Sequence, residues 1–449
     1  MMWRVPSVAV GTVQPQASVE PMVWGLLGAL VQSGLSVQGF AGTAVPESRV
    51  AVQRITGRPL RHLDAWIQSQ EQTLAAWHRG AWDSQAAVLY GAFGRDGQGE
   101  SAVTGNLELL TQRLALPRIA VVDASQLDGC RIPFPPAPVA GILLDRVSDS
   151  RSRIAWQTIL EALWDAPVLG WLEESLPARR MADFLAADQT PSPELVEQLA
   201  LAFSQTLRCK TLCHIAQRCQ GWPIPSVADF SPENRRTAVR VAVAYDEAFP
   251  CYAADSLEML EAAGAGVRDF SPLRCEQLPE GTDVVLIGTG TADRFWPELA
   301  RNCCLQQSLR SFAARGGRVY AEGSGLAYLS RQVVLEGSGR IPMAGLISVE
   351  ARRTSESRQY VPVQLTTAQA SWLFSSRQEL RGYRESGWEI VPTGPLLTFS
   401  LERESRLDVV ARRNVIGSQV IMHFASQPAL LQRFLSPFAH ARAVAGAAH

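Results

Sequence analysis

The stretch GGRVYAEGSGLAYLSRQ, residues 316–332, predicts a strand, a sharp glycine turn and a helix. Its apolar run ends at Ala321 and leads into Gly323-Ser324-Gly325, after which apolar residues recur at helical spacing. In α/β enzymes a turn of this kind exposes a nucleophile, because glycine permits the strained backbone and the helix N-terminus stabilises an anion. The stretch therefore predicts an α/β fold and raises the question of which residue, if any, is the nucleophile.

The composition indicates a large folded protein with no electrostatic preference for polyanions. The chain has 449 residues, of which 47% are apolar and 19% charged, so several domains with sizeable cores are expected. With 42 basic and 43 acidic residues the net charge is −1, which offers no attraction for nucleic acid or an anionic membrane surface. We find no secretory leader and no apolar run near the ~20 residues of a membrane helix, and we expect a soluble cytoplasmic protein.

The order of strands and helices divides the chain into three parts. Residues 1–190 alternate short apolar strands with helices, which is typical of a parallel sheet covered on both faces. Residues 191–237 contain an amphipathic helix and then a proline-rich polar stretch, which we interpret as a helix and linker. Residues 238–449 form a second α/β unit, and it contains the strand, turn and helix quoted above.

One cluster of side chains has the chemistry of metal ligands. It consists of Cys209, Cys213, His214 and Cys219. Because no CxxC pair is present, we favour structural thiols and assign no metal, while metal ligation stays open as the alternative.

Six segments in order resemble the cobyrinate a,c-diamide synthase family, whose members are glutamine-dependent amidases of corrin and related tetrapyrrole synthesis. The resemblance extends over essentially the whole chain, and the segments read TGRPLRHLDAW (56–66), LPRIAVVDA (116–124), AGILLDRV (140–147), VAVAYDEAFPCYAADSLEMLEAAGAGVRDFSPL (241–273), FAARGGRVYAEGSGLAYL (312–329) and RGYRE (381–385). The resemblance implies an N-terminal P-loop-type domain, similar to dethiobiotin synthetase, that binds ATP, magnesium and the macrocycle. It also implies a C-terminal class I glutamine amidotransferase-like domain that releases ammonia.

The nucleotide loop lacks the residues that hold a triphosphate. A P-loop closes backbone N–H groups on the phosphates, and its lysine and its Ser/Thr hydroxyl reach the phosphate oxygens and magnesium. In the corresponding stretch GTVQPQASV, residues 11–19, Gly11 and Thr12 remain, but Ser18 stands at the position of the lysine. No lysine or arginine occurs in residues 5–48 that could substitute. We therefore expect an ordinary turn between a strand and a helix.

The acidic residue that holds magnesium in the family is also replaced. In AVLYGAFG, residues 87–94, Tyr90 stands at its position, and tyrosine is a poor ligand because Mg²⁺ prefers carboxylate oxygens. Asp96 is the nearest carboxylate that could take over this role. We consequently assign no cofactor to the chain, although the family uses ATP and Mg²⁺.

The glutaminase residues are replaced in the same way. The family motif E-C-G-G presents a cysteine thiolate at the turn, whereas this chain reads EGSG and has Gly323 at the position of the cysteine. We expect the next residue, Ser324, to cap the following helix, and a shifted serine nucleophile is the alternative. The family's H-x-H pair, whose first histidine activates the cysteine, is reduced to Ile421 and His423. A lone histidine of this kind is expected to be structural, with a role as base as the alternative.

Some polar positions of the family segments are retained. Gly288 and Gly290 in IGTGT, residues 287–291, preserve part of the oxyanion-stabilising turn. The candidates for substrate binding are Asp64, Asp145, Arg146, Tyr252 and Glu385. Asp64 and Arg146 could recognise the carboxylate arms of a tetrapyrrole, because arginine offers a bidentate fork. The alternative is that Asp64 and Asp145 cap helices and that Arg146 is a surface charge.

These replacements lead to one hypothesis and two alternatives. The hypothesis is a degenerate, catalytically inactive relative that binds a tetrapyrrole or corrinoid or a homologous partner subunit. The first alternative is a working ATP-dependent amide ligase that takes free ammonia or a partner glutaminase. The second is an inactive structural subunit of a homologous complex, and a homodimer is a further option. The sequence does not identify the macrocycle.

Overall fold

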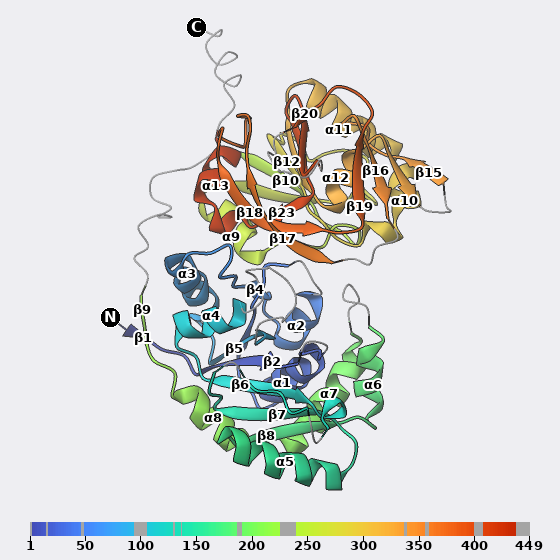
Figure 1. The fold of residues 1–449 in the computed structure, drawn as a ribbon. Coiled ribbons are helices and arrows are strands. Elements are labelled where there is room, and N and C mark those ends of the chain that lie inside the picture. Colours follow the sequence, from blue (N-terminus) through green and yellow to red (C-terminus); the bar gives the residue numbers. More distant parts are fainter. Residues whose placement is uncertain are drawn as a thin grey trace. The chain divides into compact units, whose positions relative to one another are not determined.

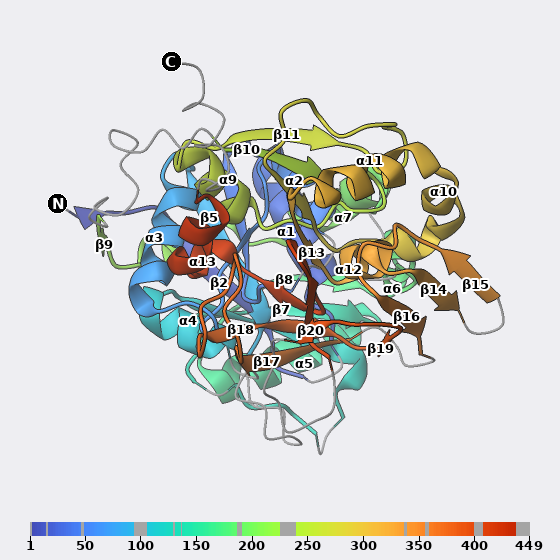
Figure 2. The same ribbon diagram turned by 90° about the horizontal axis from the view of Figure 1, so that it is seen from above.

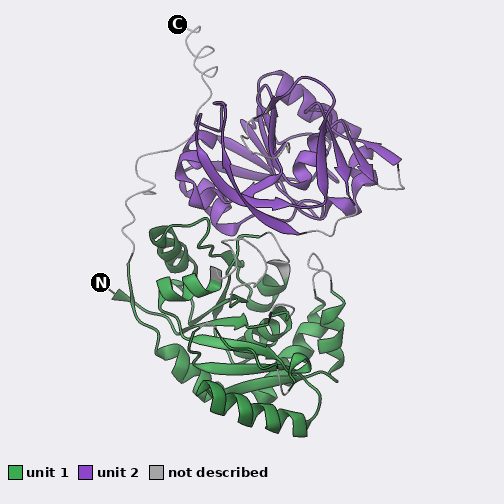
Figure 3. Ribbon diagram, in the orientation of Figure 1, with its two compact units in different colours: residues 1–226 green, residues 227–449 purple. Residues whose placement is uncertain are grey.

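The computed structural model contains two compact units, residues 1–226 and 227–449 (Figures 1–3). Residues described below are 2–14, 17–45, 49–93, 106–128, 131–135, 137–185, 191–224, 239–335, 339–354, 359–398 and 407–436. None of the helices in these ranges has both the length and the apolar character needed to cross a bilayer.

Unit 1 contains a seven-stranded sheet in which all neighbouring strands are parallel. In spatial order the strands are β4 (Arg61–His62), β3 (Val37–Ala41), β5 (Ala86–Ala92), β2 (Ser7–Thr12), β6 (Arg118–Asp123), β7 (Gly141–Val147) and β8 (Val168–Glu173). A short antiparallel pair, β1 (Met2–Trp3) and β9 (Trp222–Pro223), joins the two ends of the unit.

Helices bury the apolar strands of this sheet on both faces, as the sequence predicts. One face packs against α1 (Glu20–Gln32), α2 (Arg49–Thr56), α7 (Pro193–Thr206) and α8 (Cys209–Gln217). The other packs against α3 (Gln70–Ala81), α4 (Asn106–Leu114) and α5 (Ser150–Trp164), while α6 (Pro177–Asp183) follows β8. Helix α1 has Pro21 in its first turn, and Gly34 with φ +86° follows it.

Helix α7 differs from the sequence interpretation, which separated residues 191–237 from the first domain. The helix packs along α1 and contributes Leu199 and Phe203 to the core of unit 1. Glycines on α1 permit this approach, because a Cβ at Gly28 would lie 2.5 Å from the Cβ of Ala200. The polar stretch 225–238 of the expected linker lies outside the described residues.

Unit 2 is built on a second seven-stranded sheet. Its order is β11 (Gly266–Phe270), β10 (Arg240–Ala244), β12 (Val284–Ile287), β13 (Arg318–Glu322), β22 (Val415–Ser418), β21 (Val409–Arg412) and β20 (Leu397–Thr398). The first five strands run parallel, and the last two are antiparallel additions at one edge.

In the described residues of unit 2, two smaller sheets and five α-helices accompany the main sheet. The sheets are β15 (Gly339–Pro342), β14 (Gln332–Leu335), β16 (Val349–Arg353) and β19 (Trp388–Pro392), and β17 (Tyr360–Thr366), β18 (Glu379–Glu385) and β23 (Val420–Met422). Helices α10 (Trp296–Arg301), α11 (Cys303–Ala314) and α12 (Ser324–Leu329) contribute to one core cluster, and α9 (Ala254–Ala262) and α13 (Pro428–Phe434) to another. Both units therefore have the expected α/β architecture.

We predict that Gly28→Val loosens α7 from α1 and destabilises the protein. The valine side chain has no room against Ala200, and overpacking of this kind costs about 1–3 kcal/mol of unfolding free energy. Urea denaturation followed by circular dichroism measures the effect. The matched control is Gln32→Val, which places the same side chain at an exposed position of α1. Equal stability of the two variants would contradict the packing described for α7.

Candidate functional site

The turn between β13 and α12 has the backbone geometry of a nucleophile elbow. Strand β13 ends at Glu322, Gly323 has φ +53° and ψ −120°, and α12 begins at the next residue. Residues other than glycine rarely adopt this backbone conformation. The predicted strand, turn and helix are thus present, and the apex carries no side chain.

The space that a side chain at the apex would need is occupied by Thr289. A Cβ built on Gly323 would lie 2.5 Å from Oγ1 and 2.8 Å from Cβ of Thr289. The remaining cavity beside the apex measures about 10 Å³, which is about the space that one water molecule requires. Neither a cysteine thiol nor the carboxamide of a glutamine substrate fits there without rearrangement.

Two residues that line this small cavity, Glu385 and Trp388, are positioned by polar contacts. The side chain of Glu385 is buried, and its Oε1 accepts a hydrogen bond of 3.2 Å from Nε1 of Trp388. Arg353 lies 3.8 Å from the same carboxylate and stacks over the Trp388 ring at 5.3 Å. Glu385, a predicted substrate-binding residue, therefore anchors the side chain of Trp388 that closes the elbow.

The glycines of the oxyanion turn have their N–H groups paired within the protein. Gly288 donates to the hydroxyl of Tyr252 at 2.7 Å, and this hydroxyl donates to the carbonyl oxygen of Ala244 at 2.5 Å. Burial of the phenol group raises the pKa of Tyr252 well above its ordinary value, so it stays a neutral hydrogen-bonding group. Gly290 donates to the hydroxyl of Ser324 at 3.0 Å.

The role predicted for Ser324 needs correction. The serine is the first residue of α12, and no side-chain hydrogen bond caps that helix. Its fully buried hydroxyl instead accepts the N–H of Gly290 and lies 3.4 Å from the hydroxyl of Thr289. The reason is geometric, because the hydroxyl faces the neighbouring turn rather than the open first turn of its own helix.

Strand β23, which contains the position of the family's catalytic histidine, is hydrogen-bonded to the end of β13 next to the elbow. In β23 the N–H of Met422 donates to Oε1 of Glu322, the last residue of β13, at 3.0 Å. Ile421 stands opposite Tyr383 of β18 in this strand. His423 directly follows it, is buried, and its Nδ1 lies 2.7 Å from the hydroxyl of Ser426. The support for a base is retained, whereas the side chain expected to act as base is an isoleucine.

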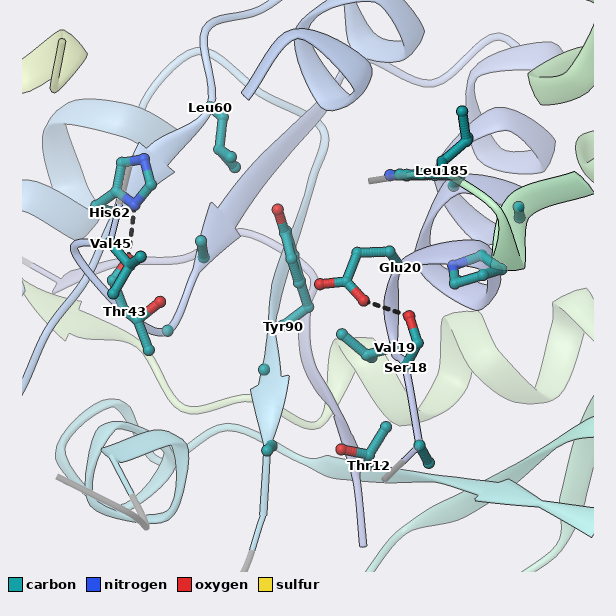
Figure 4. Close-up of a pocket in the computed structure, with 18 residues that line it drawn as sticks. Thr12, Ser18, Val19, Glu20, Thr43, Val45, Leu60, His62, Tyr90 and Leu185 are labelled. Atoms are coloured by element: carbon teal, nitrogen blue, oxygen red, sulfur yellow. Dashed lines mark hydrogen bonds between the residues drawn. The ribbon is translucent and has the colours of Figure 1, made fainter. Parts of the chain in front are cut away.

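Unit 1 contains a cavity of about 460 Å³ at the carboxyl ends of β2, β3 and β5 (Figure 4). Thr12 and Tyr90 line it, and Ser18 lies at its edge just before α1. The hydroxyl of Ser18 donates to the carboxylate of Glu20 at 2.6 Å. Among the described lining residues, Glu20 is the only aspartate, glutamate, lysine or arginine.

Of the other residues predicted for the nucleotide site, Gly11 has a packing role and Asp96 lies outside the described residues. Gly11 is inside β2, where a Cβ would lie 2.6 Å from the side chains of Leu107 and Phe93. Lys210 is the only lysine in the chain, and it is exposed in the first turn of α8 and does not line the cavity.

The substrate-binding candidates of unit 1 are engaged in internal contacts. Asp64 is fully buried, and its carboxylate accepts the N–H groups of Ala44 and Trp66 at 2.8 and 2.9 Å. It therefore fastens the loop after β3 to the turn after β4. Ser69 rather than Asp64 caps α3, so the alternative role of Asp64 as a helix cap needs correction.

Asp145 and Arg146 belong to a network of charged residues at the ends of β6 and β7. Asp145 binds the buried guanidinium of Arg179 through two hydrogen bonds of 2.7 and 2.5 Å. Arg146 lies 2.6 Å from Asp183 and 3.5 Å from Asp123. The alternative roles of a helix cap and a surface charge also need correction, because Asp149 caps α5 and Arg146 is ion-paired.

The cysteine cluster is only partly brought together. The sulfur atoms of Cys209 and Cys213 are 4.0 Å apart on α8, while Cys219 is buried and donates to the carbonyl oxygen of Val5 at 3.1 Å. Within the described ranges, no three or more His, Cys, Asp or Glu residues are arranged to hold a metal ion.

Three residues of these sites were missed from the sequence. Thr289 lies between the two glycines of IGTGT, so its proximity to the elbow could have been found from that motif. Glu20 directly follows the stretch 11–19, and an acidic residue in the first turn of the next helix was the signal. Trp388 comes from β19, a strand distant along the chain, and the sequence contains no sign that it reaches the elbow.

Comparison with known proteins identifies similar chains. Residues 240–428 match the family model of the CobB/CobQ-like glutamine amidotransferase domain. The cobyrinate a,c-diamide synthase of Syntrophotalea carbinolica is 25% identical over 96% of this chain and 98% of its own length. The hydrogenobyrinate a,c-diamide synthase of Streptomyces coelicolor is 27% identical over 96% of this chain and 97% of its own.

Among solved structures, a glutamine amidotransferase aligns with a TM-score of 0.35 at 18% identity, over 43% of this chain and 96% of that one. The resemblance to cobyrinate a,c-diamide synthases is confirmed by the similarity over nearly the whole chain. The α/β fold class with a glutamine amidotransferase-like C-terminal part is confirmed as well.

We predict that Gly323→Cys does not create a glutaminase and instead destabilises unit 2. Strain at positive φ costs about 1–2 kcal/mol, and contact with Thr289 adds about 1–3 kcal/mol. Gly345→Cys is the matched control, because Gly345 has φ +65° and its nearest neighbouring atom would be 3.9 Å from the new Cβ.

Thermal unfolding of both variants separates the two costs. The double variant with Thr289→Ala should recover about 1 kcal/mol in a double-mutant cycle. If Gly323→Cys is no less stable than Gly345→Cys, the elbow is not obstructed as described.

Proposed function

We propose that this protein is a non-catalytic relative of the cobyrinate a,c-diamide synthases and binds a tetrapyrrole of corrin or sirohydrochlorin type. The family reaction activates the a- and c-side-chain carboxylates with ATP and amidates them with ammonia from glutamine. The single observation that carries the proposal is the side-chain-free apex at Gly323, whose missing side chain has its place taken by Thr289.

Glutamine hydrolysis needs a nucleophile, a base and donors for the oxyanion. A thiolate must attack the carboxamide carbon, ammonia must leave, and water must then cleave the thioester. The apex here carries no atom that could attack, and the base position is Ile421. The N–H groups of Gly288 and Gly290 already donate to Tyr252 and Ser324. An oxyanion would have to displace both internal partners.

The ATP half-reaction needs cations that neutralise the transferring phosphoryl group. The cavity at the nucleotide loop presents a carboxylate, Glu20, beside the hydroxyl that replaces the lysine. The arginines at the same edge of the sheet, Arg146 and Arg179, are paired with Asp183 and Asp145. A triphosphate at this edge would compete with carboxylates for both of these guanidinium groups.

A binding role is supported by what the chain retains. Similarity to the diamide synthases extends over 96% of the chain, including the unit that has lost the glutaminase residues. Strand order, turns and the link between Glu322 and Met422 are kept although the reactive side chains are not. Preservation of the scaffold without the chemistry favours recognition of the family's macrocycle over a new reaction.

We expect the purified protein to release no glutamate from glutamine and no phosphate from ATP in the presence of tetrapyrrole. The synthase of Syntrophotalea carbinolica is the positive control in the same assay. Cobyrinate or sirohydrochlorin titrated into the protein should shift its visible absorption at micromolar concentration.

Two results distinguish the alternatives. Amide product detected by mass spectrometry with ammonium and ATP–Mg²⁺ would refute the inactive assignment and identify a working ligase. Absence of any spectral shift, together with a stable complex formed with an active homologue, would replace the binding role by that of a structural subunit.

A further inference from the structure

The cavity of unit 1 has the size and position of a ligand site. It measures about 460 Å³, within the usual range of roughly 300–1,000 Å³ for small-molecule pockets. Parallel sheets bind ligands beyond the carboxyl ends of their strands, and Thr12, Ala41 and Ala92 end the three strands that border it. Its location is therefore that of a functional pocket, although it lacks the residues for phosphate.

The charge of this cavity is set by Glu20. The residue lies in the first turn of α1, where a phosphate would bind in a nucleotide-binding loop, and where the helix dipole stabilises a negative group. Figure 4 shows its carboxylate in the cavity beside Tyr90. Because the protein supplies its own anion at this point, a phosphate ligand would meet charge repulsion rather than attraction.

The remaining walls suit an organic cation. Trp24 and Tyr90 contribute aromatic rings to the lining, and the face of such a ring attracts a cation through its quadrupole. The hydroxyls of Thr12 and Thr43 also lie in the lining. Nδ1 of His62 lies 2.6 Å from the carbonyl oxygen of Thr43 and donates to it. This hydrogen bond orients the imidazole, which lies at the left of Figure 4.

The charges beside the cavity add to the same preference. Helix α6 contributes Ala182 to the lining, and the adjacent Asp183 belongs to the charged network at the ends of β6 and β7. In that network Asp123, Asp145 and Asp183 face only two guanidiniums, those of Arg146 and Arg179. This network thus contains one more carboxylate than guanidinium.

We infer that this cavity binds a small organic cation, an ammonium or guanidinium group on an aromatic or apolar body, with Glu20 as its counter-ion. The inference concerns unit 1 alone and rests only on the proposed loss of phosphate binding, not on the fate of the glutaminase. It assigns to the altered nucleotide loop a ligand class of opposite charge to ATP.

Three matched probes test the charge preference by isothermal titration calorimetry on the full chain. They share an indole body and are tryptamine, which is cationic, tryptophol, which is neutral, and indole-3-acetate, which is anionic. We expect tryptamine to bind about tenfold tighter than tryptophol, as one charge-assisted hydrogen bond allows, and indole-3-acetate to bind weakest.

Two substitutions test whether Glu20 is the source of the preference for a cationic ligand. Glu20→Gln should weaken tryptamine about tenfold and leave tryptophol within about twofold. Glu71→Gln is the matched control, because Glu71 also lies in the first turn of a helix of unit 1, is exposed and does not line the cavity. Thermal unfolding of both variants confirms that they are folded, and the probe series on the unsubstituted protein does not depend on them.

The results separate this inference from the proposed function. Three results would overturn the cation site. Indole-3-acetate could bind as tightly as tryptamine or more tightly, or tryptamine could fail to bind at millimolar concentration. The third is that Glu20→Gln and Glu71→Gln weaken tryptamine binding equally. Displacement of tryptamine by Mg²⁺ alone would overturn it too, because Glu20 would then be a metal ligand. Tight binding of ATP–Mg²⁺ would overturn both this inference and the loss of phosphate binding, whereas glutamate release from glutamine would leave the cation site standing.

Discussion

The chain must reverse direction between β13 and α12 within a single residue, and the contacts of the candidate site depend on that constraint. Gly323 meets it with a backbone conformation that costs glycine little. Around it, Thr289 fills the space beside the apex, and the hydroxyl of Ser324 satisfies the N–H of Gly290. Buried N–H groups need hydrogen-bond partners, and here the groups around the apex find them in one another.

Much of this architecture follows from local pattern. The apolar strands, the helix with Pro21 at its start and Gly34 past its end, and the glycine elbow are all encoded within a few residues of where they act. The packing of α7 on α1 could not be predicted from either helix alone. It depends on Gly28 meeting Ala200, two residues that are far apart along the chain.

In the candidate sites, too, local sequence motifs could be interpreted from the sequence, whereas contacts between distant residues could not. The differences from the family's phosphate-binding and glutaminase motifs could be seen in the sequence, because each motif has a fixed spacing. The contacts at these positions could not be predicted, because Trp388 reaches Glu385 and Tyr252 reaches Gly288 only through the tertiary fold. Asp145 shows the same limit, since the sequence left substrate binding and helix capping open as its roles, while in the structure Arg179, from a later helix, binds it.

Thr289 has a consequence for how this lineage can change. A cysteine introduced at position 323 would meet an occupied volume, and a histidine introduced alone at position 421 would have no thiol at the apex to activate. Either substitution alone would supply only one of the two groups that glutamine hydrolysis needs, and the cysteine would also lower the stability of unit 2. The effects of substitutions at residues in direct contact, such as positions 323 and 289, do not simply add. The occupied volume thus makes the order of substitutions matter, because Thr289 must become smaller before a side chain at position 323 can be accepted without a clash.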